Sequence, residues 1–228
     1  MENQKTAILI FANSGQQESF AKPFKSSALL FDELNNHTLH TVKTTGLPYF
    51  HISEKEQMGN SFAERFNNAI QSIYAKGFET VISVGNDTPH LKTSQIREAA
   101  LQLETKDIVL GPSLDGGFYL MGLKKSLFKA ETFLKLPWQT SRLSQSIYQF
   151  IDDYHIQLFK LEMLSDIDSV SDIKFILQSG KYLSSSLKKI FSELISQLTE
   201  ANYSYRFHNS NSFQNSYFNK GSPELIHI

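Results

Sequence analysis

Short apolar runs alternate with helix-like patterns along this chain. Residues 6–12, 79–85 and 107–111 are each rich in β-branched or other aliphatic side chains, which is typical of a buried strand. After Ser61, apolar residues fall on one face of a predicted helix. Ser61 and the glutamate three positions later form a capping box at its start, and Gly77 stands where a C-cap glycine ends a helix. This alternation predicts an α/β protein with crossover helices and a mostly parallel central sheet.

Further elements follow from the same patterns. Residues 24–34 suit a helix, and two short extended pieces are predicted after it, at residues 39–43 and 47–52. Thr93 or Ser94 can cap another helix, which runs to about Leu103.

The carboxyl-terminal part differs in composition from the rest. We expect one α/β domain over residues 1–180 and an extension over residues 181–228. Residues 182–198 have the apolar spacing of an amphipathic helix that packs on the domain. Residues 202–228 are rich in asparagine, serine and aromatic side chains, which favours one or two strands or a subunit contact in a homodimer. A further hypothesis is that residues 219–221 form part of a phosphate site.

Charge and composition narrow the functional class. The formal net charge is −1, which argues against a nucleic-acid surface as the main function. No apolar stretch is long enough to span a bilayer, and no signal-peptide pattern is present. The absence of cysteine excludes disulfides, thiolate metal sites and a cysteine nucleophile. The simplest expectation is a cytoplasmic protein.

The segment VISVGNDTPHL, residues 81–91, places a carboxylate directly after a predicted buried strand. Gly85 ends the strand and Pro89 prevents its continuation. In open parallel sheets, ligands bind outside the carboxyl ends of the strands, so Asp87 would face a ligand. The alternative is an Asx-turn, in which Asp87 only bonds to its own backbone.

The segment DIVLGPSLDGGFYLMGL, residues 107–123, contains a second acidic turn. Asp115, Gly116 and Gly117 separate two apolar runs, and a ligand could approach the two glycines closely. A hairpin-like turn explains the same residues without a ligand. Because Asp87 also lies at a strand end, we expect both acids to face one crevice.

A third acidic cluster, SDIDSVSDI, follows a strand-like run at residues 156–161. Asp168 or Ser169 can cap the next helix, and Asp172 adds negative charge to its first turn. This structural explanation does not require Asp166.

Acids at separate strand ends can bind Mg²⁺ or Mn²⁺, which take oxygen ligands and complete their shell with water and substrate phosphates. The chemistry would then be displacement at phosphorus or at an anomeric carbon. The seven histidines are scattered without metal-ligand spacing, and the Gly-x-Ser-x-Gly motif of serine hydrolases does not occur.

Five segments together resemble a bacterial GT-A-like glycosyltransferase family, domain-of-unknown-function family 2064, related in fold to phospholactate and molybdenum-cofactor guanylyltransferases. They occur in the family's order and spacing: QMGNSFAERFNNAI (57–70), VISVGNDTPHL (81–91), DIVLGPSLDGGFYLMGL (107–123), LPWQTSR (136–142) and SDIDSVSDI (165–173). The resemblance covers roughly residues 57–177.

The resemblance implies a three-layer α/β/α nucleotide-diphospho-sugar transferase fold. It implies that Asp87 is the metal-binding acid and Asp168 a possible second ligand. Asp115, with the glycines 116–117, would line the sugar or acceptor pocket, and Trp138 would form one wall of it.

The segment after the first strand departs from the family pattern. Members usually carry a proline-glycine and a lysine-threonine-arginine-leucine signature there, suited to binding nucleotide phosphates. This chain has FANSGQQESFAKPFKSS at residues 11–27, with no arginine. Lys22 and Lys25 are the candidate phosphate-binding cations, although lysine does not bind bidentately as arginine does.

Three functions follow as hypotheses. The first is a metal-dependent glycosyltransferase that uses a nucleotide-activated sugar and an unidentified small-molecule acceptor, with Asp115 orienting the acceptor or serving as base. The second is a nucleotidyltransferase of the guanylyltransferase type. The third is a non-catalytic relative that acts as a binding or assembly protein.

Overall fold

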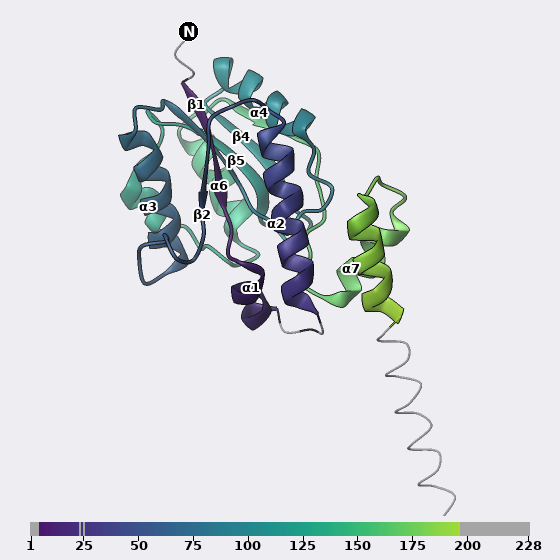
Figure 1. The fold of residues 1–228 in the computed structure, drawn as a ribbon. Coiled ribbons are helices and arrows are strands. Elements are labelled where there is room, and N and C mark those ends of the chain that lie inside the picture. The colour runs from purple at the N-terminus through teal and green to yellow at the C-terminus, as the bar shows by residue number, and fades with distance from the viewer. Residues whose placement is uncertain (1–4, 23, 25, 197–228) are drawn as a thin grey trace, which may run out of the picture.

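A six-stranded sheet in the order β2-β1-β3-β5-β4-β6 forms the centre of the computed structural model, which describes residues 5–22, 24 and 26–196 (Figure 1). The strands are β1 (Thr6–Phe11), β2 (Tyr49–Ile52), β3 (Thr80–Val84), β4 (Ile108–Pro112), β5 (Phe118–Lys124) and β6 (Leu158–Lys160). The helices up to residue 178 are α1 (Gly15–Ala21), α2 (Ser27–Lys43), α3 (Phe62–Ala75), α4 (Thr93–Thr105), α5 (Ala130–Leu134), α6 (Leu143–Asp153) and α7 (Val170–Gln178). Residues 185–196 are also helical.

The sheet is mostly parallel. β1 pairs in parallel with β2 and β3, and β4 pairs in parallel with β6. β5 lies antiparallel between β3 and β4. The carboxyl ends of β1, β3 and β4 therefore meet at one edge, near α1 in Figure 1. The predicted mixed α/β fold with a mostly parallel sheet is confirmed.

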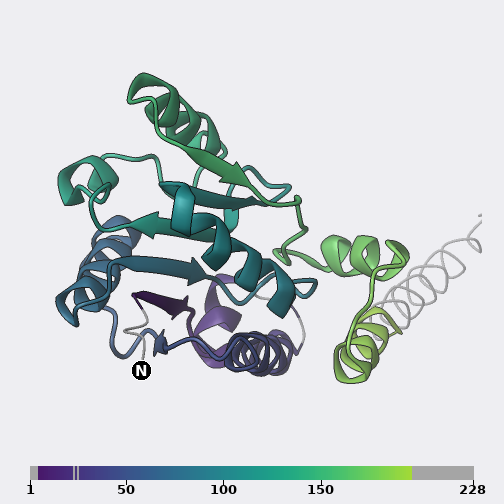
Figure 2. The same cartoon turned by 90° about the horizontal axis from the view of Figure 1, so that it is seen from above.

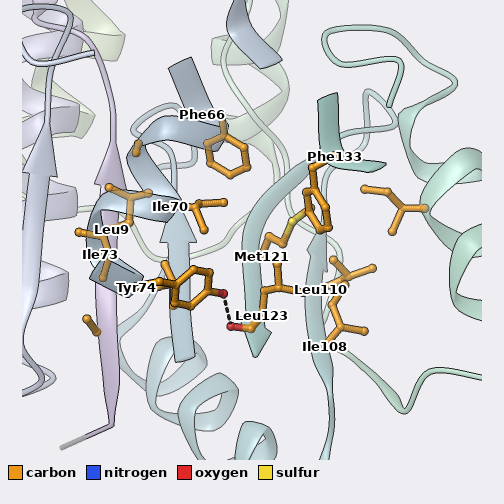
Figure 3. Close-up of a cluster of buried hydrophobic side chains, with 14 of the residues drawn as sticks. Leu9, Phe66, Ile70, Ile73, Tyr74, Ile108, Leu110, Met121, Leu123 and Phe133 are labelled. Atoms are coloured by element: carbon orange, nitrogen blue, oxygen red, sulfur yellow. Dashed lines mark hydrogen bonds between the residues drawn. The ribbon is translucent and has the colours of Figure 1, made fainter. Parts of the chain in front are cut away.

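Helices cover both faces of the sheet, which gives three layers (Figure 2). On one face, α3, α5 and α6 pack on alternate side chains of β1, β4 and β5. Figure 3 shows part of this core, in which Leu9 and Ile70 pack between strand and helix, and the Tyr74 hydroxyl donates to the Leu123 carbonyl at 2.9 Å. On the other face, α2 and α4 cover the remaining side chains of the same strands. The five residues of β3 are all buried, as expected for a central strand.

A third apolar cluster lies beside the sheet, where α2 contacts the end of the described chain (Figure 1). Leu30, Phe31 and Leu34 of α2 pack with buried side chains of α7 and of the helical segment 185–196. The amphipathic helix predicted for residues 182–198 begins at residue 185 and, as far as residue 196, packs on α2 and α7. Residues 202–228, with the suggested phosphate site at residues 219–221, lie outside the described part.

One local prediction is wrong, and one helix is not predicted. Residues 39–43 are helical, because α2 continues to Lys43 with Leu34, Thr38 and Thr41 buried at helical spacing along one side. The sequence pattern also does not predict α1, which is capped by the Ser14 side chain accepting from the Gln17 backbone N–H.

Within the described residues, no helix combines the length and apolar character that spanning a lipid bilayer requires.

Candidate functional site

A cleft of about 550 Å³ lies at the carboxyl ends of β1 and β3, beside the β4–β5 turn. Its acidic side chains come from four separate segments of the chain. They are Glu18, Asp87, Asp115, Asp166 and Asp168. The sequence-based expectation that Asp87 and Asp115 face one crevice therefore agrees with the geometry.

The Lys22 ammonium lies between two of the acids of the cleft. Its Nζ lies 3.1 Å from Asp87 Oδ2 and 2.8 Å from Asp168 Oδ1, and it donates to the Ile167 carbonyl at 2.8 Å. Burial alone would lower the pKa of Lys22, but the two carboxylates outweigh burial and raise it. Lys22 is therefore a charged internal partner for both acids. The Asp87 side chain contacts Lys22 rather than forming the Asx-turn that was the alternative.

Asp166 lies beside this group, in the segment between β6 and α7. The Thr88 hydroxyl donates to Asp166 Oδ1. Burial raises the pKa of Asp166 well above its ordinary range, the negative charge of Asp87 adds to this shift, and hydrogen bonds from Thr88 and Ser113 oppose it. The site thus favours the protonated form of one carboxyl while a second, Asp87, is paired with a cation.

The β4–β5 turn presents Asp115 at the cleft. Asp115 Oδ1 accepts from the Ser113 hydroxyl at 2.6 Å and from the Gly117 backbone N–H at 2.8 Å. The predicted hairpin-like turn is confirmed by the antiparallel pairing of the two strands. Gly116 adopts a φ of 94° and its carbonyl accepts from Ser144, so it attaches the turn to α6, whereas Gly117 lines the cleft.

An asparagine network fixes the amino-terminal wall of the cleft. Asn86 Nδ2 donates to Asn35 Oδ1 at 3.0 Å, and Asn35 Nδ2 donates to the Asn13 carbonyl at 2.9 Å. Asn13 in turn donates to Glu18 on α1. Burial raises the pKa of Glu18, with Lys22 opposing the shift. The ends of β1 and β3 are therefore connected through side chains of α2 and α1.

The opposite wall of the cleft is aromatic. Trp138 packs against Phe62 and Phe66 of α3, with ring centroids 5.6 and 5.1 Å apart. Its indole N–H donates to the Phe133 carbonyl, so the ring orientation is fixed from α5. Trp138 lines the cleft, as the resemblance implies, and also forms part of the core around α3.

The charge of the cleft is unbalanced. Among the described residues, five acids line it, and its cationic side chains are those of Lys22 and Arg65. A phosphorylated ligand entering this cleft would need additional positive charge, because Lys22 is already paired with two acids.

The oxygens around Lys22 Nζ are of the type that hard divalent cations bind. Two carboxylate oxygens and one backbone carbonyl converge there, and Mg²⁺ and Mn²⁺ prefer such ligands. Across the described residues, no group of three or more His, Asp or Glu side chains is arranged to bind a metal. Mg²⁺ is commonly bound by one or two carboxylates with substrate phosphates completing the shell, so this smaller set is compatible with it.

Several participants are not singled out by the sequence. Glu18 and Asn35 belong to no recognisable motif, and Asn35 reaches the site through a contact between distant segments. Ser113 lies in the segment 107–123 but is not singled out, and its hydroxyl donates to Asp115 two residues on. One indication for Asp166 comes from the sequence: the capping of α7 explains the neighbouring acids but does not require this one. Lys25, the other predicted phosphate-binding cation, lies outside the described residues.

A second hollow, of about 640 Å³, lies at the opposite edge of the sheet, beside the amino ends of β1 and β3. Its charged lining residues are Lys5, Glu79, Arg97, Glu104 and Lys124. Among the described residues, three cations and two acids line this hollow, so it lacks the acidic excess of the carboxyl-end cleft, and the sequence motifs do not contribute to it. The carboxyl-end cleft is therefore the candidate site.

A comparison with protein-family models gives the family of the chain. A family model described as uncharacterized protein conserved in bacteria (DUF2064) matches residues 27–140, which is half of the 228-residue chain. The chain belongs to the DUF2064 family. This match includes Asp87, Asp115 and Trp138. A search of curated proteins found no match.

Solved structures share the fold of this DUF2064 protein. A Desulfovibrio desulfuricans protein, solved as a candidate nucleotide-diphospho-sugar transferase, is 20% identical with a TM-score of 0.74, over 85% of this chain and 98% of that one. The 4-diphosphocytidyl-2C-methyl-D-erythritol synthase of Anaerococcus prevotii is 13% identical with a TM-score of 0.52, over 77% and 97%. Rv0371c of Mycobacterium tuberculosis is 11% identical with a TM-score of 0.51, over 77% and 99%. At these identities the likeness concerns the fold, which is that of nucleotide-diphospho-sugar transferases.

Proposed function

We propose that this DUF2064 protein is a metal-dependent glycosyltransferase, which moves a sugar from a nucleotide-activated donor to a small-molecule acceptor. The observation that carries the proposal is the convergence of Asp87 and Asp168 on one cationic centre at the carboxyl ends of the strands. In α/β sheets this edge is where ligands bind.

Asp87, Asp168 and the Ile167 carbonyl would hold the divalent cation. When bound, Mg²⁺ or Mn²⁺ would neutralise the leaving diphosphate. The acids themselves would repel a diphosphate, so a cation between protein and donor also explains how an acidic cleft accepts an anionic substrate.

Asp115 is the candidate group for the acceptor. Both of its hydrogen bonds end on Oδ1, and within the described residues none ends on Oδ2. Oδ2 would accept the proton of the acceptor hydroxyl while that oxygen bonds to the anomeric carbon. The bond between the anomeric carbon and the phosphate oxygen breaks, and the nucleoside diphosphate leaves with the electron pair.

The aromatic wall would position the ring of the sugar or of the acceptor. Trp138 presents a ring fixed by its hydrogen bond to Phe133, and apolar sugar faces pack well on such rings. The fold supports the proposal as an analogy, because proteins named as a nucleotide-diphospho-sugar transferase and a diphosphocytidyl synthase share it.

The test is turnover of nucleotide sugars. The purified chain is incubated with a panel of them and Mn²⁺ or Mg²⁺, and release of nucleoside diphosphate is measured. We expect metal-dependent release with one donor class and a loss of about 100-fold or more in Asp87→Asn, because a metal ligand contributes several kcal/mol to such a step. Asp107→Asn is the matched control, since Asp107 pairs with Lys124 at the opposite edge of the sheet.

The same assay separates the alternatives. A nucleotidyltransferase would release pyrophosphate from a nucleoside triphosphate when a phosphorylated substrate is present. A non-catalytic relative would release neither product, and Asp87→Asn would then behave like the natural chain. Either result would contradict the glycosyltransferase proposal.

A further inference from the structure

The three oxygens around Lys22 satisfy all three N–H donors of its ammonium group. They are Asp87 Oδ2, Asp168 Oδ1 and the Ile167 carbonyl oxygen, at 3.1, 2.8 and 2.8 Å from Nζ. These are also the oxygens that suit a divalent cation. A metal ion bound to all three oxygens would have to take the position of Nζ, and the two cations would repel each other there.

Lys22 is built into this position rather than resting on the surface. Its side chain is 16% exposed, and Nζ lies 5.1 Å from the centroid of the Phe31 ring of α2. A lysine ammonium is positively charged at neutral pH, so the competition is between two cations.

We propose that Lys22 is a displaceable internal cation, which competes with the divalent metal for Asp87 and Asp168 and couples metal binding to donor binding. The inference rests on the proposed function for the identity of the donor. When the metal takes the acid pair, the ammonium on its flexible four-carbon stem loses its partners and gains a new one in the donor diphosphate. Metal and nucleotide would therefore each strengthen the binding of the other.

The charge of the cleft supports this coupling. Apart from Lys22, the cationic lining residue among those described is Arg65, on the aromatic side. Of the two described cations that line the cleft, a released Lys22 would thus be the one at the acidic end, where the diphosphate and metal would meet.

The experiment measures Mn²⁺ binding directly, by electron paramagnetic resonance and calorimetry without any turnover. Lys22→Met removes the charge and keeps the stem length, Lys22→Arg keeps a charge, and Lys181→Met removes a lysine that pairs with Glu162 outside the cleft. Without nucleotide, we expect Lys22→Met to bind Mn²⁺ roughly tenfold more tightly than the natural chain, because a like charge has left the site. Lys181→Met should match the natural chain, and Lys22→Arg should not show the gain.

Coupling is measured by repeating the titration with saturating nucleoside diphosphates. In the natural chain one of them should strengthen Mn²⁺ binding, and this gain should shrink in Lys22→Met. In the unmodified protein, NMR of ¹⁵N-labelled lysine side chains adds a test that needs no variant. The Lys22 ammonium signal should change when Mg²⁺ is added.

The outcomes are distinguishable. Equal or weaker Mn²⁺ binding by Lys22→Met, or a Lys22 signal unchanged at saturating Mg²⁺, would overturn the competition while leaving the metal-dependent transferase intact. Failure of the natural chain and of both Lys22 variants to bind Mn²⁺, with or without nucleotide, would overturn the metal part of the proposed function as well.

Discussion

The Ile167 backbone N–H donates to the Asp87 backbone carbonyl at 2.9 Å, although the two residues lie far apart in the sequence. This bond fixes the segment between β6 and α7 to the turn after β3. It places Asp166 and Asp168 on the two sides of a residue that is already attached to the Asp87 turn. The acids of the cleft are therefore positioned by backbone, and Lys22 joins them through its side chain.

The cap of α7 should influence the Asp168 side of the site. Asp172 Oδ2 accepts from the backbone N–H groups of Asp168 and Ser169, at 3.0 and 2.7 Å. We expect Asp172→Ala to lower the free energy of unfolding by about 1 kcal/mol, as for other lost caps. It should also weaken Mn²⁺ binding, because the Asp168 backbone N–H loses this hydrogen bond and the residue is held less firmly.

Ser61→Ala is the matched control for this effect. Ser61 caps α3 through a capping box with Glu64 and is exposed, outside the cleft. Its loss should cost a similar amount in urea unfolding and leave Mn²⁺ affinity unchanged. If the two variants bind Mn²⁺ equally well, the cap has no influence on the site.

Parts of this site follow from local sequence, because local chemistry determines them. A β-branched run ending in glycine predicts β3 and puts Asp87 at its carboxyl end. The Asp-Gly turn predicts the hairpin that presents Asp115. Both depend on residues that are neighbours in the chain.

The rest depends on contacts that no local pattern encodes. Lys22 reaches Asp87 because α1 turns the chain back over the cleft, and α1 is too short to give a clear helical period. Residues 39–43 contain β-branched residues that favour strands, but their burial against the sheet keeps them in α2. Tertiary packing overrides propensity in that segment.

Trp138 should report ligand binding by fluorescence. It is the sole tryptophan of the chain and lines the cleft beside Phe62 and Phe66. A donor or acceptor that enters the cleft changes the environment of the indole ring, so its emission should shift in a saturable way. Titration with nucleotide sugars and Mn²⁺ checks this. A ligand that raises the melting temperature without altering the emission would show that binding occurs elsewhere.

Gly111 should not tolerate a side chain. A Cβ added there would lie 2.5–2.9 Å from ring atoms of Tyr119, whose hydroxyl donates to the Glu162 carbonyl. We expect Gly111→Ala to lower the free energy of unfolding by about 1–3 kcal/mol through overpacking. Gly85→Ala is the control, because its nearest contact would be an ordinary 3.4 Å to Asp87. Equal stability of the two variants in urea unfolding would show that Tyr119 can move without cost.

His90 should make the protein less stable in mild acid. It is 4% exposed, and its Nε2 has no hydrogen-bond partner among the described residues. Burial lowers the pKa of His90 from 6.5 to about 4, and the positive charges of Lys181 and Lys92 add to the shift. Between these two values the unfolded chain binds a proton that the folded chain does not, so stability falls as the pH falls through this window.

Replacing His90 should remove this dependence. In His90→Leu, the free energy of unfolding should fall less steeply between pH 6.5 and pH 4, by at most about 1.4 kcal/mol per pH unit. Urea unfolding at several pH values, followed by circular dichroism, measures the slope. His51→Gln, at an exposed position on β2, controls for the loss of a histidine as such and should keep the slope of the natural chain. Parallel pH curves for His90→Leu and the natural chain would mean that His90 binds its proton equally well in the folded and unfolded states.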